Sequence, residues 1–312
     1  MLRKPKTITS NNRAPKTLKP QQARQLIRRF HVLQKNRKSL EQLLSEVKPG
    51  FDLETYLQSP EPAYTKQLKE YKYAKTPEIH HIDRKLLYAE LIRTLAKVDA
   101  ELQQRGGLHV YQMASTVGQK SERGGDSLKW LVTLYKRLGR TATRTLEIGS
   151  LSPTNAILTS GIFGEVTRID LNSQHPQILQ QDFMKRPLPL GKDEKFDLIL
   201  CSLVLNFVPT PSGRGNMLRR MTEFLEPFQK EQKPSLFFVL PLPCVTNSRY
   251  FNKSLFANVM KSLGFEEIEY HEAKKVAYWL FDWHGRGKKI QYPSKSEVNP
   301  GKQRNNFYID MN

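Results

Sequence analysis

Cysteine is scarce in this 312-residue sequence, in which only Cys201 and Cys244 occur. Two cysteines are too few for a disulfide framework or a cysteine-rich zinc site, so an intracellular, reducing compartment is expected. The seven histidines show no metal-ligand spacing. No apolar run approaches the roughly 18 residues that a membrane helix requires, and the basic N-terminus lacks a hydrophobic signal segment. We therefore expect no secretion, no membrane association and no metal site.

Acidic residues are scarce at the N-terminal end. Residues 1–50 contain 13 Lys/Arg and only two Glu, within a chain whose formal net charge is +20. Such a surplus favours a polyanionic partner, because basic side chains that neutralise phosphates release counterions, and nucleic acid is the simplest partner of this kind. The alternative is a solvated basic tail that aids solubility or nuclear import.

The first part of the chain is predicted to be helical. Residues 1–19 lack an apolar period and are expected to form a disordered basic tail. Residues 20–130 are expected to form a helical N-terminal region, because apolar side chains recur at helical spacing over residues 20–48 and again over 83–105. A proline-containing stretch, residues 59–67, separates these two helical patterns.

Over residues 131–283 the sequence pattern changes to short β-rich runs that alternate with helical stretches. The strand candidates are "RTLEIG", "EVTRIDL", "FDLILCSLVL" and "SLFFVLPL". This alternation predicts an α/β domain with a parallel sheet and crossover helices, in which ligands bind beyond the carboxyl ends of the strands. Residues 284–312 are basic and rich in turn formers, so we expect a C-terminal tail that is either flexible or an auxiliary RNA contact.

Glycine is missing where a nucleotide-binding turn would have it. In "TLEIGSLSPTNA", residues 145–156, Gly149 is followed by Leu151 and Thr154 where a dinucleotide fold needs its next glycines. Asp170 ends the second predicted strand 21 residues later, at the spacing at which a carboxylate accepts hydrogen bonds from ribose hydroxyls. S-adenosylmethionine has a nucleoside but no pyrophosphate, so it suits this turn better than NAD. Taken singly, Gly149 also fits an ordinary turn, and Asp170 a helix cap.

Two later segments support this choice of ligand. The pair Asp182-Phe183 in "LQQDFMKRPLP" offers an acceptor for an adenine amino group and an apolar wall for its ring. The apolar run "FDLILCSLVLNFVP" ends in a polar turn, where Ser202 and Asn206 are expected near the transfer cleft. Asn206 fits the cap of the following helix equally well.

These segments together resemble a known family. "LEIGSLSPTNA", "RIDLNSQHPQILQQDFM", "FDLILCSLVLNFVP" and "HVYQMASTVGQKSERGGDS" are similar to the fungal large-subunit (25S) rRNA adenine-N1 methyltransferases, whose animal relatives include an S-adenosylmethionine sensor of the TOR pathway. The resemblance covers roughly residues 80–283. It implies a seven-stranded class I (Rossmann-like) methyltransferase fold, residence in the nucleolus, and large-subunit rRNA or a pre-ribosomal particle as partner. It also implies that Gly149 and Asp170 are the principal contacts of S-adenosyl-L-methionine. The neighbouring candidates are Glu147, Ser150, Asp182 and Phe183.

Methyl transfer to adenine N1 needs no nucleophile or metal from the protein, because N1 carries its own lone pair. The enzyme must unpair the base, align N1 with the sulfonium methyl group and exclude water. Asn206 and Phe207 are our candidates for contact with the target base, through an amide edge and a stacking ring. The sequence identifies no catalytic base.

Two alternatives remain open. A thiolate mechanism through Cys201 or Cys244 requires a lowered thiol pKa, whereas free cysteine is usually a small buried hydrophobe. A non-catalytic S-adenosylmethionine sensor that acts through protein partners would use the same Gly149 and Asp170. The basic N-terminus favours the RNA enzyme over the sensor.

Overall fold

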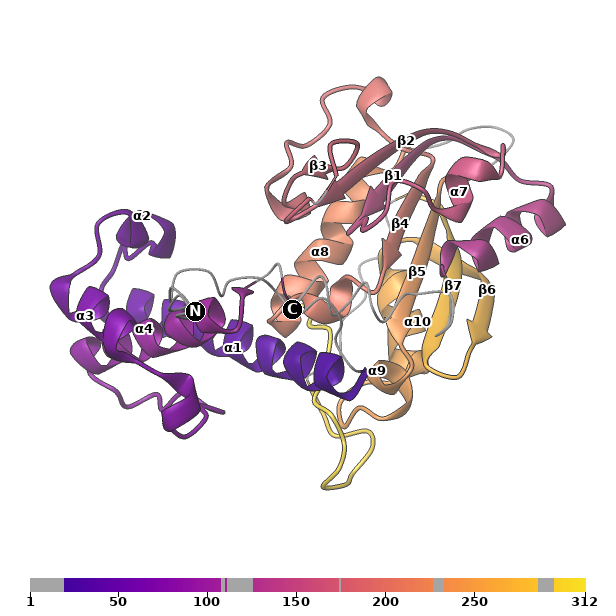
Figure 1. Cartoon of the computed structure of the whole chain (residues 1–312). Helices are drawn as coiled ribbons and strands as arrows, with labels where there is room; N and C mark the ends of the chain where they lie inside the picture. Colours follow the sequence, from indigo (N-terminus) through magenta and orange to yellow (C-terminus); the bar gives the residue numbers. More distant parts are fainter. Residues whose placement is uncertain (1–19, 108–109, 111–125, 174, 227–232, 286–294) are drawn as a thin grey trace, which may run out of the picture. The chain divides into compact units, whose positions relative to one another are not determined.

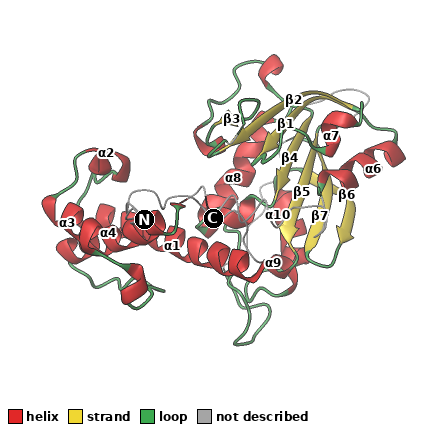
Figure 2. Ribbon diagram, in the orientation of Figure 1, coloured by secondary structure: helices red, strands yellow, loops and turns green. Residues whose placement is uncertain are grey.

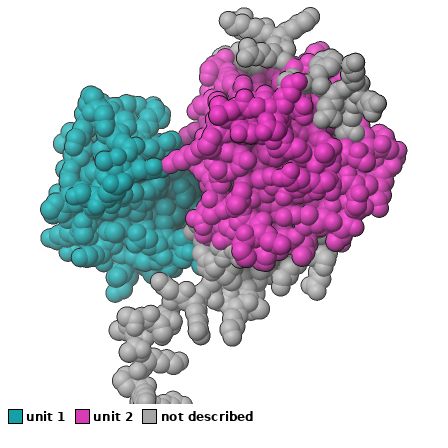
Figure 3. All heavy atoms as spheres, turned by 90° about the horizontal axis from the view of Figure 1, so that it is seen from above, with its two compact units in different colours: residues 1–123 teal, residues 124–312 magenta. Residues whose placement is uncertain are grey.

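The computed structural model describes residues 20–107, 110, 126–173, 175–226, 233–285 and 295–312. The chain divides into two units, residues 1–123 and residues 124–312 (Figure 3). The boundary expected at residue 130 falls inside helix α6 (Leu128–Leu138), which belongs to the second unit. The basic tail predicted over residues 1–19 lies outside the described residues. Across the described part of the chain, no helix is long and apolar enough to span a membrane.

The first unit is helical, as its apolar periodicity predicts. Its elements are α1 (Pro20–Val47), α2 (Leu53–Gln58), α3 (Pro62–Glu70), the 3-10 helix η2 (Tyr73–Lys75) and α4 (Tyr88–Gln104) (Figure 1). Leucines of α1 and α4 form the centre of its hydrophobic core. The stretch expected to separate two helices contains the start of α3 instead, because Pro62 occupies the first helical turn, where a proline has no hydrogen bond to lose.

Buried ion pairs join α1 to α4 within this unit. Arg29 donates to both carboxylate oxygens of Glu101, at 2.7 and 2.6 Å, and Arg105 donates to Glu101 at 2.7 Å. Burial alone would raise the pKa of Glu101, but these hydrogen bonds bring it below its usual value. The unit therefore has a core and an internal charge network of its own.

The second unit is built on a seven-stranded sheet (Figure 2). Its strands are β1 (Ala142–Ile148), β2 (Phe163–Asp170), β3 (Leu179–Gln180), β4 (Leu198–Ser202), β5 (Ser235–Pro241), β6 (Phe265–Glu272) and β7 (Val276–Trp283). The order is β3-β2-β1-β4-β5-β7-β6. β1 to β5 are parallel, and β7 is antiparallel to both of its neighbours. This arrangement confirms the predicted parallel α/β sheet and the seven-stranded class I methyltransferase fold.

Helices cover both faces of the sheet. One core cluster joins the strands to α8 (Pro211–Phe224), α9 (Pro243–Thr246) and α10 (Lys253–Ser262). The opposite cluster joins them to α6 and α7 (Ala156–Thr159). Phe237 and Phe238 of β5 belong to different clusters. β5 is therefore buried on both faces, which explains its uninterrupted apolar sequence.

The last residues of the chain return to the core, so the predicted C-terminal tail is wrong for this part. The Nη1 group of Arg214 on α8 donates to the carbonyl oxygen of Tyr308 at 2.8 Å. A Cβ atom at Gly215 would lie 1.9 Å from the carbonyl oxygen of Asp310, so only glycine lets the segment pass this close to α8. The buried side chains are Phe307, Tyr308, Ile309 and Met311. Their short apolar run was obscured by the basic, turn-rich composition that precedes it.

Candidate functional site

The ends of β1 and β2 meet at the carboxyl edge of the sheet. The N–H groups of Gly149 and Ser150 both donate to the carbonyl oxygen of Ile169, at 2.8 and 3.1 Å. Asp170 follows Ile169 directly, so the two residues predicted as principal cofactor contacts lie at the ends of adjacent strands. The N–H groups of Gly149 and Ser150 therefore already have an acceptor within the protein. A contribution of Gly149 to a ligand must therefore come from close approach of its backbone.

Both the backbone conformation at position 149 and a neighbouring side chain require glycine there. Its φ of +75° lies in the left-handed region that favours glycine. A Cβ atom at this position would also lie 2.4 Å from Cγ2 of Val204. Val204 belongs to the turn after β4, which carries Asn206. The predicted cofactor turn therefore packs against the turn that carries the predicted base contacts.

Glu147 is buried at the end of β1, with 8% of its surface exposed. Asn155 Nδ2 donates to both of its carboxylate oxygens, at 2.9 and 3.0 Å, and Arg168 Nε lies 3.8 Å from Oε2. Burial nevertheless raises the pKa of Glu147 to about 7. Ser150 is buried as well, at 2% exposure. These side chains hold the turn in shape, and their direct contact with a cofactor stays a prediction.

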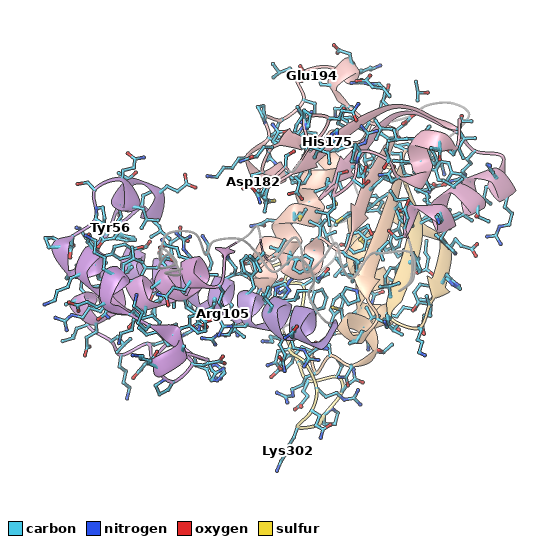
Figure 4. All side chains as sticks on the ribbon, viewed as in Figure 1. Tyr56, Arg105, His175, Asp182, Glu194 and Lys302 are labelled. Carbon is cyan, nitrogen blue, oxygen red and sulfur yellow. The ribbon has the colours of Figure 1, made fainter. Side chains whose placement is uncertain are left out.

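Two half-buried carboxylates lie beyond β2 and β3. Asp170 Oδ1 accepts a hydrogen bond from the N–H of Asn172 at 2.8 Å, in a turn rather than at the start of a helix. Gln180 pairs with Asp170 in the sheet, and Asp182 follows two residues later beside β3 (Figure 4). Carboxylates here suit the ribose hydroxyls and adenine amino group of S-adenosyl-L-methionine, because both of those groups are donors. The residues present therefore fit this cofactor.

Phe183 is buried beside α8, and its contact with the adenine ring stays a prediction. Its side chain is 3% exposed, and its ring centroid lies 5.3 Å from that of Phe224 on α8. Arg220 Nε donates to the carbonyl oxygen of Phe183 at 2.9 Å. With so little surface exposed, the ring anchors the 3-10 helix η4 (Phe183–Lys185) to the core.

The turn after β4 begins earlier than the apolar sequence indicates. The predicted strand continues to Leu205, whereas β4 ends at Ser202. Leu203 then adopts a φ of +58°, the one positive φ of a non-glycine residue in the described ranges. A branched side chain is strained in this region. Residues Leu205–Phe207 form the 3-10 helix η6.

Asn206 lies in η6 and does not cap the following helix. The N-cap of α8 is Thr210, whose hydroxyl accepts a hydrogen bond from the N–H of Gly213 at 3.0 Å. Asn206 Oδ1 is buried, and no donor among the described residues reaches it. The side chain as a whole is half-buried, as is that of Phe207. The cap alternative for Asn206 is therefore removed.

Asp126 and Ser127 connect three elements at this edge. Asp126 accepts hydrogen bonds from the N–H of Leu128 at 2.9 Å and from the N–H of Ala156 at 2.7 Å, so one carboxylate joins the starts of α6 and α7. Ser127 Oγ lies 2.8 Å from Ser202 Oγ at the end of β4. Sequence reasoning identified a helix cap here but had no signal for the two long-range contacts. The stretch "YQMASTVGQKSERGG" before Asp126 lies outside the described residues.

Neither cysteine is suited to covalent catalysis. Burial raises the pKa of both Cys201 and Cys244 to about 12, so each is a thiol at neutral pH. Cys201 is fully buried in β4, and Cys244 is 9% exposed in α9. Within the described ranges, no three His, Cys, Asp or Glu side chains are grouped so that they could hold a metal ion.

Comparison with known proteins gives a family and two curated relatives. The family model described as "Bmt2: 25S rRNA (adenine(2142)-N(1))-methyltransferase" matches residues 96–309. A Saccharomyces cerevisiae protein named 25S rRNA (adenine(2142)-N(1))-methyltransferase is 34% identical over 343 residues, which cover 99% of each chain. A Schizosaccharomyces pombe protein named 25S rRNA adenine-N(1) methyltransferase is 42% identical over 226 residues, covering 70% of this chain and 82% of the relative.

Solved structures are more distant. A Burkholderia thailandensis 1,6-didemethyltoxoflavin-N1-methyltransferase, solved with S-adenosylhomocysteine, is 13% identical with a TM-score of 0.41, over 56% of this chain and 88% of that chain. A likeness of this degree assigns no role to any residue. The family match and the full-length relative settle the classification without it. This chain belongs to the Bmt2 family of 25S rRNA (adenine(2142)-N(1))-methyltransferases.

Proposed function

We propose that this protein transfers the methyl group of S-adenosyl-L-methionine to N1 of an adenine in large-subunit rRNA. The observation that carries the proposal is the packing of Gly149 against Val204, because it sets a nucleoside-binding turn beside the turn with Asn206 and Phe207. Membership of the family supports the reaction, since both yeast relatives are named for methylation of 25S rRNA adenine at N1. We infer that the target corresponds to adenine 2142 of the family's name.

The cofactor end of the site is assigned by chemistry. S-adenosyl-L-methionine supplies an electrophilic methyl group on a sulfonium. Asp170 accepts hydrogen bonds from the ribose hydroxyls, and Asp182 accepts one from the adenine amino group of the cofactor. Gly149 lets the backbone approach the ligand closely. Asn155 and Glu147 stabilise this turn through the two hydrogen bonds between them.

The base end of the site has to bind and orient rather than move a proton. Adenine N1 attacks with its own lone pair, so no side chain has to remove a hydrogen from it. Asn206 supplies an amide edge and Phe207 a ring for the extruded base. Holding N1 in line with the methyl group and keeping water out account for much of the rate, because alignment removes the entropy cost of bringing the reactants together.

The partner and the location follow from the same proposal. We infer that the protein acts on large-subunit rRNA or a pre-ribosomal particle in the nucleolus. The formal net charge of +20 and the basic residues 1–50 support a partner rich in phosphate. Neutralisation of phosphates by these residues would hold the RNA near the site whatever its sequence, while the pocket selects the base.

The test is mass spectrometry of nucleosides from large-subunit rRNA of cells with and without the gene. Loss of one N1-methyladenosine, restored by the wild-type chain and not by Gly149→Arg, is expected. An unchanged N1-methyladenosine content, with the purified protein still binding S-adenosylmethionine, would overturn the enzyme and leave the cofactor sensor in its place.

A further inference from the structure

Asn206 Oδ1 is a hydrogen-bond acceptor in the turn after β4. It is buried, and no donor among the described residues reaches it. Buried polar atoms in folded proteins nearly always have a partner, because an acceptor removed from water without a donor destabilises the fold. A donor group on a bound ligand would satisfy this oxygen.

The backbone near Asn206 is strained. Leu203, three residues earlier, holds a φ of +58° although its side chain disfavours that region. Strain of this kind persists only where the surroundings impose it, and it gathers at ligand sites. Val204, which follows Leu203, packs against Gly149. The strained turn thus presents Asn206 next to the cofactor turn.

We propose that Asn206 Oδ1 accepts a hydrogen bond from the exocyclic N6 amino group of the target adenine and thereby selects adenine over guanine. This role rests on the proposed function. On the edge that is methylated, adenine has the acceptor N1 beside an amino donor. Guanine has an N1–H beside the acceptor O6, which would face the amide oxygen of Asn206 with like partial charge. An amide oxygen that no described residue occupies is suited to this choice.

The same hydrogen bond favours the reaction itself. The N1 lone pair forms the new N–C bond while the C–S bond breaks, and the electron pair of that bond stays on sulfur, which becomes a neutral thioether. No proton moves, so the ring of the product carries one positive charge. The amino group becomes a stronger donor as this charge develops, and its bond to Asn206 Oδ1 tightens toward the transition state. Interactions of that kind raise kcat rather than lower KM.

The experiment removes the donor and the acceptor of this hydrogen bond separately: the N6 amino group of the target base, and the side chain of Asn206. One rRNA fragment carries the target adenosine, and a second carries purine riboside, which lacks the N6 amino group, at the same position. Transfer of tritiated methyl from S-adenosylmethionine is measured with wild-type protein and with Asn206→Ala. We expect Asn206→Ala to lower kcat/KM for the adenosine RNA roughly 10- to 150-fold, mostly through kcat. It should change kcat/KM for the purine RNA by less than about threefold, because there the bond is already absent.

Two further variants separate recognition from folding. Asn206→Asp keeps an acceptor oxygen and should still prefer the adenosine RNA. Asn252→Ala removes an N-cap hydrogen bond to Leu255 at the start of α10, so it should destabilise the second unit and affect both RNAs alike. Calorimetric affinity of Asn206→Ala for S-adenosylmethionine should match that of the wild type.

The outcomes are distinct. Equal losses on both RNAs in Asn206→Ala would overturn the proposed role of Asn206 while leaving the methyltransferase activity in place. A wild-type protein that methylates adenosine at a ring position other than N1 would overturn the proposed function, and the role of Asn206 would fall with it.

Discussion

Replacing Glu147 by Gln tests whether burial keeps a proton on the acid at the end of β1 up to about neutral pH. The carboxyl group is 8% exposed, and burial raises its pKa from 4.5 to about 7. Glutamine has the same shape and no charge. Its Oε1 can accept from Asn155 Nδ2, which replaces one of the two hydrogen bonds that the carboxylate accepts from that group. The substitution therefore keeps one of these hydrogen bonds and the size of the side chain while it removes the titration.

The sign of the effect follows from the two pKa values. Between pH 4.5 and about 7 the folded protein holds a proton on Glu147 that the unfolded chain has released. The free energy of unfolding should therefore fall as pH rises through this window and level off above it. At about 1.4 kcal/mol per pKa unit, this contribution falls by about 3 kcal/mol. Glutamine shows no such fall. Arg168 also loses its carboxylate neighbour, but its charge is the same at every pH tested, so this shifts the variant by a constant.

The assay is chemical unfolding from pH 5 to pH 8, followed by tryptophan fluorescence. All three tryptophans, Trp130, Trp279 and Trp283, lie in the second unit, so the signal reports on the unit that contains Glu147. The matched control is Glu165→Gln on β2, whose side chain is 72% exposed and should leave the pH dependence unchanged. Parallel loss of stability in wild type and Glu147→Gln between pH 5 and 8 would refute the reasoning, because Glu147 would then be ionised throughout.

The remaining predictions concern ligand binding. Gly149→Arg should abolish calorimetric binding of S-adenosylmethionine, since any side chain there meets Val204 and a φ of +75°, and normal affinity in a folded variant would remove the site from this turn. Asp170→Ala should weaken cofactor binding roughly 10- to 150-fold by removing the ribose hydrogen bonds, whereas a change below about threefold would make Asp170 only a turn residue. Deleting residues 1–19, with six Lys/Arg and no acid, should lower the slope of log RNA affinity against log salt by about 0.7–0.9 for each phosphate that the segment neutralises, and should leave cofactor affinity unchanged. An unchanged slope would mean that the tail does not bind RNA.

Strands β4 and β5 could be predicted from the sequence because they are buried on both faces. Their sequences are apolar for this reason, as in "SLFFVLPL", whereas β1 and β2 were indicated by short β-rich runs that alternate with helical stretches. The register of Gly149 and Asp170 at neighbouring strand ends followed from the same pattern. β3 is two residues long, and β6 and β7 pair with each other in antiparallel fashion, so none of the three gave the alternation with helices that located the rest.

The side-chain contacts of the site could not be predicted, because they join residues far apart in the sequence. Nothing local in "SLVLNFVP" indicates that Val204 meets Gly149, or that the strand stops at Ser202. The adjacent pair Asp182-Phe183 predicted two ligand contacts, but Asp182 is half-buried whereas Phe183 is buried, a difference that the sequence did not indicate. Proline misled the prediction at α3, where Pro62 begins a helix rather than interrupting one.

Several features that destabilise the folded protein lie together at the carboxyl edge of the sheet. Glu147 is buried with a raised pKa, Asn155 and Asn206 have buried oxygens that no described residue satisfies, and Leu203 is strained. Local rules are commonly broken at functional sites and compensated elsewhere in the fold. A purely structural origin makes a different prediction from a functional one. If Glu147→Gln stabilises the second unit at pH 8 and leaves S-adenosylmethionine affinity unchanged, the cost of the buried acid belongs to the fold alone. If stability rises while affinity falls, the buried acid is kept for the ligand, as the stability–activity trade-off predicts.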